Sequence, residues 1–148
     1  MNTRPAAKPH LLRLRLLARG GASTTPGAPA SSAGEVYHPD DHQVHNLIQA
    51  SGTRVAWAPE FLEFPSWAAG TDLMFAEAAG WARPIRFAKD TGGHAPALEV
   101  AEQAVRHGVR RLVFAHIGRP TIKALDAGHV PPFGEIGTEG ATYTVARS

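Results

Sequence analysis

Short apolar runs recur along the chain after its first third, and each has the length of a buried strand. They lie at residues 54–58, 73–76 and 112–115, and residues 141–145 are expected to form a final strand. Runs of four or five apolar residues are typical of strands in the interior of a layered fold. We therefore predict a sheet built from these segments.

A helical pattern fills the interval before the third run. Apolar positions from 98 to 105 recur at the spacing of one helix face, Pro96 stands at a first-turn position, and Gly108 follows the last turn. Residues 120–127 predict a second, shorter helix. Strands that alternate with helices predict an α/β fold.

The first 34 residues have a different composition. They contain five basic residues and no acidic one, and residues 20–34 are a mixture of Gly, Ala, Ser, Thr and Pro. We expect residues 1–34 to form a disordered basic tail, because residues 20–34 offer no side chain large enough to anchor in a core. Residues 11–17 keep no single period, so their pattern leaves their structure open, and an organelle transit peptide is an alternative for this segment.

Composition excludes several classes of function. A chain of 148 residues is expected to form one domain, and the absence of cysteine excludes disulfides, thiolate metal clusters and cysteine nucleophiles. Any metal site must use His and carboxylates, and we expect a reducing, cytoplasmic location. Arg13 and Arg15 interrupt the longest leucine-rich stretch, which falls short of the ~20 apolar residues that a bilayer requires. We expect neither a membrane nor a nucleic acid as a partner.

Polar residues follow three of the predicted strands, at the point where each run ends. These residues are Glu60, Glu77 and His116. In open α/β sheets, ligands bind outside the carboxyl ends of the strands, so parallel strands would place all three residues on one rim. His and carboxylate side chains are ligands for Zn, Mn or Fe. The alternative is that each residue is a strand-end polar group satisfied by its neighbours.

A glycine-rich loop precedes the first predicted helix. Gly92 and Gly93 permit close approach to a ligand, and the helix N-terminus offers N–H groups to an anion, so a phosphate could bind beside His94. His94 would then act as a general acid. The alternative is a tight turn in which His94 caps the helix or is exposed.

Residues 92–116 resemble the final third of metallo-β-lactamase-fold hydrolases. In the phosphodiesterase branch, which includes tRNA 3′-processing endonucleases, a Gly-His loop begins a helix and a strand ends in a metal-binding His. Residues 55–60 are similar to the strand that supplies the bridging Asp, and residues 72–77 to the next strand, which ends in a carboxylate near the site. The resemblance covers about residues 36–145 and implies a partial αββα sandwich, with one layer of helices on a mixed sheet.

The resemblance also implies roles for individual residues. His116 would be a metal ligand, His94 would protonate the leaving oxygen, and Glu60 stands where the family has Asp. Gly92 and Gly93 would contact the substrate. Arg119 could bind a substrate phosphate, although a surface arginine is the simpler interpretation. A further ligand from the preceding loop would be one of three alternatives, His38, His42 or His45.

One family motif is absent. The H-x-H-x-D-H motif should lie well before residue 36, and residues 1–35 contain one histidine, His10. Residues 35–148 therefore resemble the C-terminal half of the family's domain, and a truncated or mistranslated gene product is the favoured explanation, ahead of a split protein or a remnant.

The resemblance implies a metal-dependent hydrolase, in which hydroxide on a divalent cation attacks a small-molecule phosphodiester or another ester. Zn is the expected metal, with Mn and Fe as alternatives, and the chain alone would be weakly active or inactive. The alternative function is a non-catalytic α/β half-domain that acts in protein association. Half a sandwich would leave one sheet face uncovered, which predicts binding to a complementary N-terminal half or self-association.

Overall fold

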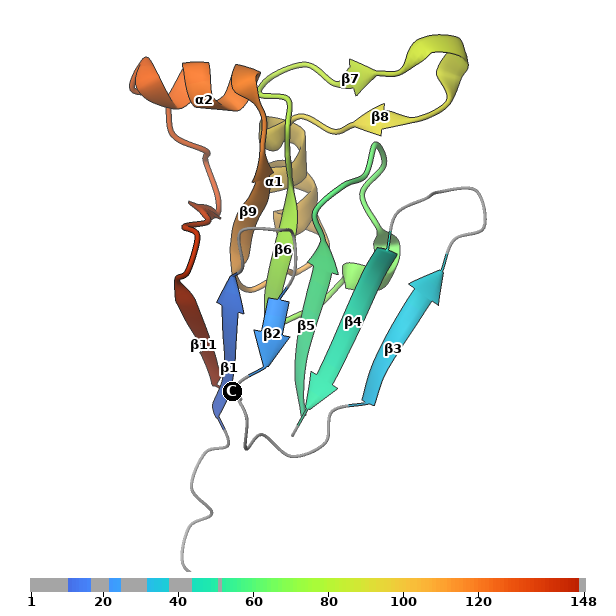
Figure 1. The fold of residues 1–148 in the computed structure, drawn as a ribbon, viewed down its shortest axis with the longest axis vertical. Helices are drawn as coiled ribbons and strands as arrows, with labels where there is room; N and C mark the ends of the chain where they lie inside the picture. The colour runs from blue at the N-terminus through green and yellow to red at the C-terminus, as the bar shows by residue number, and fades with distance from the viewer. Residues whose placement is uncertain (1–10, 17–21, 25–31, 38–43, 51, 147–148) are drawn as a thin grey trace, which may run out of the picture.

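A mixed six-stranded sheet forms the centre of the fold, with strand order β10-β9-β6-β5-β4-β3 (Figure 1). The computed structural model describes residues 11–16, 22–24, 32–37, 44–50 and 52–146. The strands are β3 (Ser32–Tyr37), β4 (Val44–Ala50), β5 (Thr53–Ala58), β6 (Leu73–Ala78), β9 (Leu112–Ile117) and β10 (Glu135–Ile136). The strands β5, β6, β9 and β10 are parallel, whereas β4 is antiparallel to both β3 and β5. The three predicted central strands are confirmed.

Helix α1 (Ala97–Arg106) covers one face of this sheet, with Val100, Ala101 and Ala104 buried against it. The facing strand positions are mostly small, which allows the helix to lie close to the sheet; they include Ala56, Ala76 and Ala78. The predicted helices are confirmed to within about one residue at their ends, since α2 spans Arg119–Asp126. No helix within the described residues is long and apolar enough to cross a membrane.

A second, three-stranded sheet lies on the other face. It has the order β11-β1-β2, from β11 (Thr142–Ala146), β1 (Leu11–Leu16) and β2 (Ala22–Thr24). Tyr143 and Val145 of β11 are buried in one cluster with Trp57, Phe75 and Val113 of the large sheet. The expectation of an uncovered sheet face is therefore wrong at these positions.

The expectation of a disordered tail is wrong for three segments of residues 1–34. Strand β1 pairs along its length with β11, β2 pairs with β1, and β3 begins at Ser32. Residues 11–15, where Leu and Arg alternate, pair with a strand near the other end of the chain. The local pattern could not indicate this partner. The remaining residues of the expected tail, 1–10, 17–21 and 25–31, lie outside the described residues.

A small hairpin stands at the carboxyl end of the parallel strands, beside α2 (Figure 1). It consists of β7 (Ile85–Arg86) and β8 (Gly93–His94), joined through the 3-10 turn η2 (Ala88–Asp90). Another 3-10 turn, η1 (Ser66–Ala68), lies between β5 and β6. A Cβ at Gly93 would lie 2.1 Å from the carbonyl oxygen of Ile85, so the close crossing of the two strands requires glycine here.

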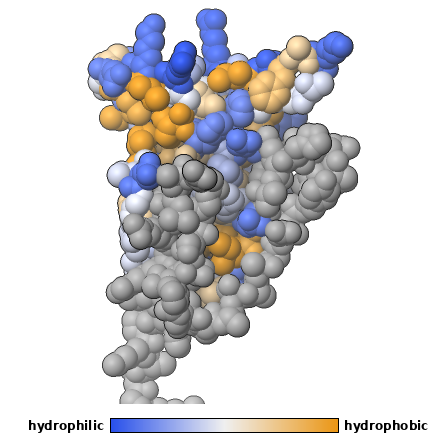
Figure 2. All heavy atoms as spheres, in the orientation of Figure 1, coloured by the Kyte–Doolittle hydropathy of each residue, from blue (hydrophilic) through white to orange (hydrophobic). Residues whose placement is uncertain are grey.

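The start of α2 fixes the chain just beyond β6. The Thr121 hydroxyl lies 2.6 Å from the carbonyl oxygen of Ala78 and 2.9 Å from that of Gly80. A Cβ at Gly118 would lie 2.1 Å from the carbonyl oxygen of Ala79, so only glycine allows this approach. Figure 2 shows hydrophobic and hydrophilic surface side by side at the end of the molecule where α2 and the hairpin lie.

Candidate functional site

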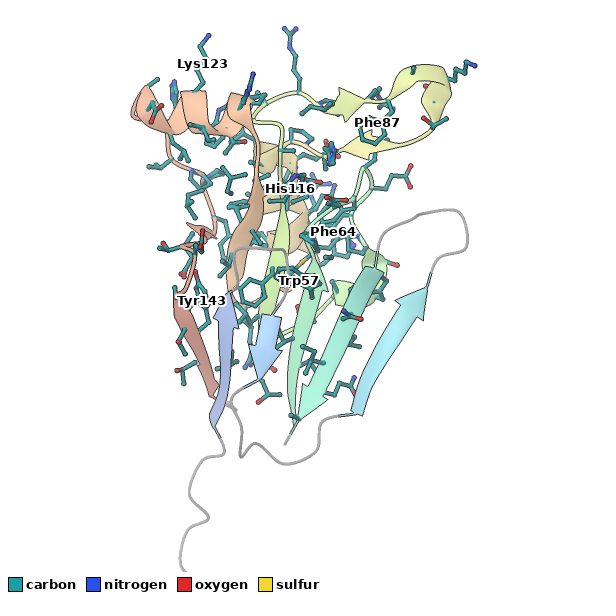
Figure 3. The ribbon with its side chains drawn as sticks, viewed as in Figure 1. Trp57, Phe64, Phe87, His116, Lys123 and Tyr143 are labelled. Atoms are coloured by element: carbon teal, nitrogen blue, oxygen red, sulfur yellow. The ribbon has the colours of Figure 1, made fainter. Side chains whose placement is uncertain are left out.

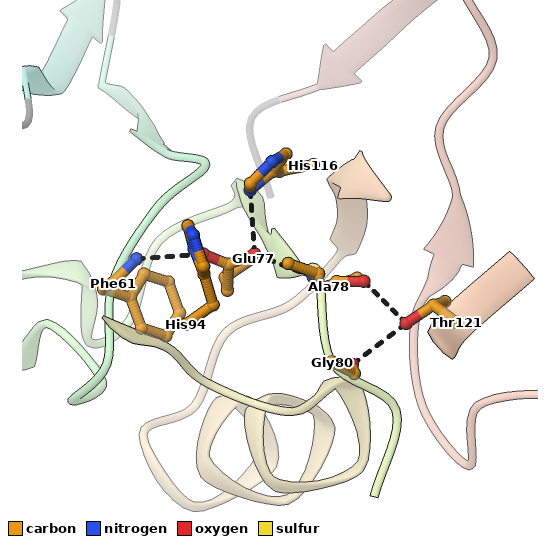
Figure 4. A network of polar contacts seen from close by, with 8 residues as sticks. Phe61, Glu77, Ala78, Gly80, His94, His116 and Thr121 are labelled. Atoms are coloured by element: carbon orange, nitrogen blue, oxygen red, sulfur yellow. Dashed lines mark hydrogen bonds and ion pairs between the residues drawn. The ribbon is translucent and has the colours of Figure 1, made fainter. Parts of the chain in front are cut away.

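A buried carboxylate joins two histidines at the carboxyl end of the sheet (Figure 4). Glu77 of β6 is 0% exposed and accepts four hydrogen bonds. The backbone N–H groups of Phe61 and Ala79 donate to Oε2 and Oε1, at 3.2 and 2.8 Å. The Nδ1 atom of His94 lies 2.7 Å from Oε2, and that of His116 lies 3.0 Å from Oε1.

Sheet register brings the first of these pairs together. Strands β6 and β9 are parallel, and a shift in register after Ala76 places Glu77 directly opposite His116. Both residues lie inside their strands, because β6 and β9 each run two residues further than the sequence predicts. His94 belongs to a separate element, the hairpin strand β8, and lies two residues before the N-cap of α1.

The carboxylate determines the orientation of both imidazole rings. A carboxylate only accepts hydrogen bonds, so the Nδ1 atom of each histidine carries the hydrogen, and Nε2 is the ring nitrogen that Glu77 leaves unoccupied. The ring centroids of His94 and His116 lie 5.0 Å apart, at an angle of 66°. Their side chains are 15% and 36% exposed, so both remain within reach of a ligand.

The pKa of His116 is raised above the ordinary 6.5, mainly because its side chain hydrogen-bonds to Glu77. Partial burial opposes this by disfavouring the charged ring, while the negative charges of Glu77 and Glu60 and the carbonyl of Pro59 raise the pKa further. Glu60 therefore acts on His116 electrostatically, although it belongs to the loop after β5.

Glu77, His94 and His116 could together hold a metal ion, since each offers a ligand atom and these atoms lie within 4.8 Å of one another. Nitrogen and oxygen donors of this kind suit a divalent transition metal. Each oxygen of Glu77 already accepts two hydrogen bonds, which uses the roughly four lone-pair sites of a carboxylate. Glu77 therefore suits the role of a hydrogen-bond partner at Nδ1, which leaves the Nε2 atom of a histidine to hold a cation, as is common around metal-bound histidines.

The structure brings together three residues that the sequence singles out. Two of them, His94 and His116, lie together, as the resemblance implies. Glu77 lies between them; the sequence places it on the same rim, but its position alone gives no sign that it binds both histidines. Glu60 is not one of the three grouped residues, among those that the structure describes.

The remaining predicted site residues belong to other elements or lie outside the described residues. Arg119 is the exposed first residue of α2, and within the described residues no hydrogen bond joins it to Glu77 or either histidine. His38 and His42 lie outside the described residues. The backbone of His45 pairs with Val36, between β4 and β3.

The expectation of a phosphate at the start of α1 is wrong for its first two N–H groups. Ala97 N–H donates to the carbonyl of Gly80 at 2.8 Å, and Leu98 N–H donates to that of Trp81 at 3.1 Å. These groups are therefore already satisfied by the chain that follows β6. Gly93 is explained by the hairpin crossing, as the tight-turn alternative predicts.

A comparison with solved structures finds a similar fold in the metallo-β-lactamase fold protein YhfI from Bacillus subtilis. The TM-score is 0.52 at 17% sequence identity, and the match covers 97% of this chain and 55% of that one. The sequence matches no protein-family model and no curated protein. At this identity the likeness shows the fold alone: the chain has a mixed α/β fold that corresponds to a partial metallo-β-lactamase-type sandwich, which confirms the predicted fold class. This chain spans little more than half the length of YhfI.

Proposed function

We propose that the chain is a metal-dependent hydrolase that cleaves a small-molecule phosphodiester or another ester. The observation that carries this proposal is the buried carboxylate of Glu77, which holds Nδ1 of both His94 and His116. Such an arrangement leaves the Nε2 atoms available to a ligand, and the metallo-β-lactamase-type fold supports a metal at this place.

In this proposal His116 holds the metal through Nε2. Glu60, whose charge already acts on His116, is a second ligand, and one of His38, His42 or His45 supplies the third. Zn is the proposed metal, and Mn or Fe would suit the same donors. When bound, a divalent cation of this kind lowers the pKa of its water to about 7, which makes a nucleophile available near neutral pH.

His94 moves the proton in this scheme. Glu77 holds its Nδ1–H, so the proton passes between Nε2 and the leaving oxygen. The hydrogen bond from Nδ1 to Glu77 keeps the ring in one orientation during the transfer. Arg119 and Gly92 are proposed contacts for the rest of the substrate, at the same end of the sheet.

The described residues supply few ligands, so we propose at most one weakly bound metal per chain and weak turnover. A complementary segment carrying the H-x-H-x-D-H motif would raise both. The alternative that we keep is a non-catalytic half-domain that acts in protein association. The reducing, cytoplasmic location expected from the lack of cysteine belongs to the same proposal.

The test compares wild-type protein with His116→Ala and with His129→Ala, which removes an exposed histidine from the loop after α2. After dialysis against a chelator, each protein is titrated with Zn and assayed with bis-p-nitrophenyl phosphate. We expect Zn binding and turnover in the wild type and His129→Ala, and loss of both in His116→Ala. Turnover that survives His116→Ala contradicts the proposal, and a folded protein with neither Zn binding nor turnover supports the non-catalytic alternative.

A further inference from the structure

An exposed phenylalanine lies against the proposed proton donor. Phe87 is 44% exposed, and its ring centroid lies 5.1 Å from that of His94, with the rings at 87°. Phe87 is the one exposed side chain among the Phe, Trp and Tyr residues whose burial the structure describes. Figure 3 shows it on the hairpin, at the same end of the sheet as His116.

The hairpin holds Phe87 in this position through its backbone. Ile85 pairs with His94, and Phe87 is two residues further along, so all three side chains belong to one face of the hairpin. The N–H of Phe87 donates to the carbonyl of Gly92 at 2.9 Å, which closes the turn. Lys89 and Asp90 adopt positive φ values of 60° and 53°, a conformation that non-glycine residues rarely take unless the surrounding structure requires it.

The contacts of His94 leave a defined place for a ligand. Its Nδ1 edge is held by Glu77, and Phe87 packs against its ring. A leaving oxygen that takes a proton from His94 must therefore approach Nε2, and the exposed ring of Phe87, which packs against the same imidazole, is available to the group attached to that oxygen. A flat apolar group gains contact there, whereas a small or strongly hydrated group does not.

We propose that Phe87 determines leaving-group specificity and selects esters of aryl or similarly flat apolar alcohols. This inference rests on the proposed hydrolase function. In the reaction, the oxygen of a water forms a bond to phosphorus, or to the acyl carbon. The bond from that atom to the leaving oxygen breaks, with its electron pair remaining on the oxygen. The Nε2 proton of His94 neutralises that oxygen, and the proton lost by the attacking water restores His94, so the alcohol leaves neutral beside Phe87.

The experiment measures binding first, because binding does not require turnover. Phenyl phosphate and methyl phosphate are titrated separately into the full chain with excess Zn, and binding is followed by ligand-observed NMR. The variants are Phe87→Ala, Phe87→Leu and Val105→Ala. The last is the control, because it removes an exposed apolar side chain from α1. Thermal melts establish that each variant is folded, and Phe87→Leu keeps apolar bulk in the hairpin if Phe87→Ala unfolds.

We expect the wild type and Val105→Ala to bind phenyl phosphate about tenfold more tightly than methyl phosphate. Phe87→Ala should remove this preference, and Phe87→Leu should reduce it. Equal binding of the two phosphates by the wild type, binding of neither, or an unchanged preference in folded Phe87 variants would overturn the inference.

The same proteins are then assayed for turnover of methyl and phenyl diesters. This assay distinguishes a failure of the hydrolase proposal from a failure of the role proposed for Phe87. Wild-type turnover without a Phe87-dependent preference for phenyl leaving groups retains the hydrolase and overturns the role of Phe87. A Phe87-dependent binding preference without any turnover retains the aryl subsite and overturns the hydrolase.

Discussion

Replacing Glu77 with Gln tests whether this carboxylate organises the end of the sheet. The substitution preserves shape but puts an amide nitrogen where one carboxylate oxygen stood. At either oxygen position a backbone N–H already donates, from Phe61 or from Ala79. The histidine on that side can change its tautomer and accept a hydrogen bond from the new amide. The backbone N–H on that side can only donate, so it faces the amide N–H as a second donor in a fully buried place.

The expected loss of stability follows from these contacts. A buried donor without a partner costs about 1–3 kcal/mol, and the bonds that remain change from charge-assisted to neutral, which costs about a further 1 kcal/mol. We therefore expect Glu77→Gln to lower the free energy of unfolding by about 2–4 kcal/mol. For a chain of this length, roughly 2–4 °C in Tm corresponds to each kcal/mol, so the expected fall in Tm is about 5–15 °C.

Urea unfolding and thermal melts of chelator-treated protein measure this loss without interference from metal. Glu102→Gln is the matched control, because Glu102 bonds to Arg106 at 2.6 Å on the surface of α1, with both side chains more than half exposed. Such an i, i+4 pair contributes about 0.3–0.5 kcal/mol, so this variant should melt close to the wild type. If Glu77→Gln loses no more stability than Glu102→Gln, the role assigned to Glu77 is wrong.

Two further predictions concern His116 and Gly118. Because the pKa of His116 is raised in the fold, its stabilising contribution is fully present below pH 6.5 and is lost as pH rises through the raised pKa. Melts of chelator-treated protein across this range should therefore show a larger decline in Tm for the wild type than for His116→Gln, and equal declines would contradict the cited shift. Gly118→Ala places a Cβ 2.1 Å from the carbonyl oxygen of Ala79 and should cost about 1–3 kcal/mol in urea unfolding. A neutral result would show that α2 can move away from β6 without loss.

Local patterns in the sequence were sufficient for the centre of the fold. The strands β5, β6 and β9 are short apolar runs, and α1 carries its apolar residues on one face, so burial alone distinguishes them from their surroundings. His116 could be selected because it follows directly on such a run, and His94 because it follows two glycines before a helix.

Contacts between distant segments decided the rest. The pairing of β1 with β11 joins the two ends of the described chain, and the sequence pattern of neither strand predicts which strand it pairs with. The role of Glu77 depends on the register of β6 against β9 and on the arrival of His94 from the hairpin. The periodicity of a sequence indicates which face of a helix or strand is buried. Strand register and the hydrogen-bond partners of a buried carboxylate depend instead on contacts between segments that meet only in the folded chain.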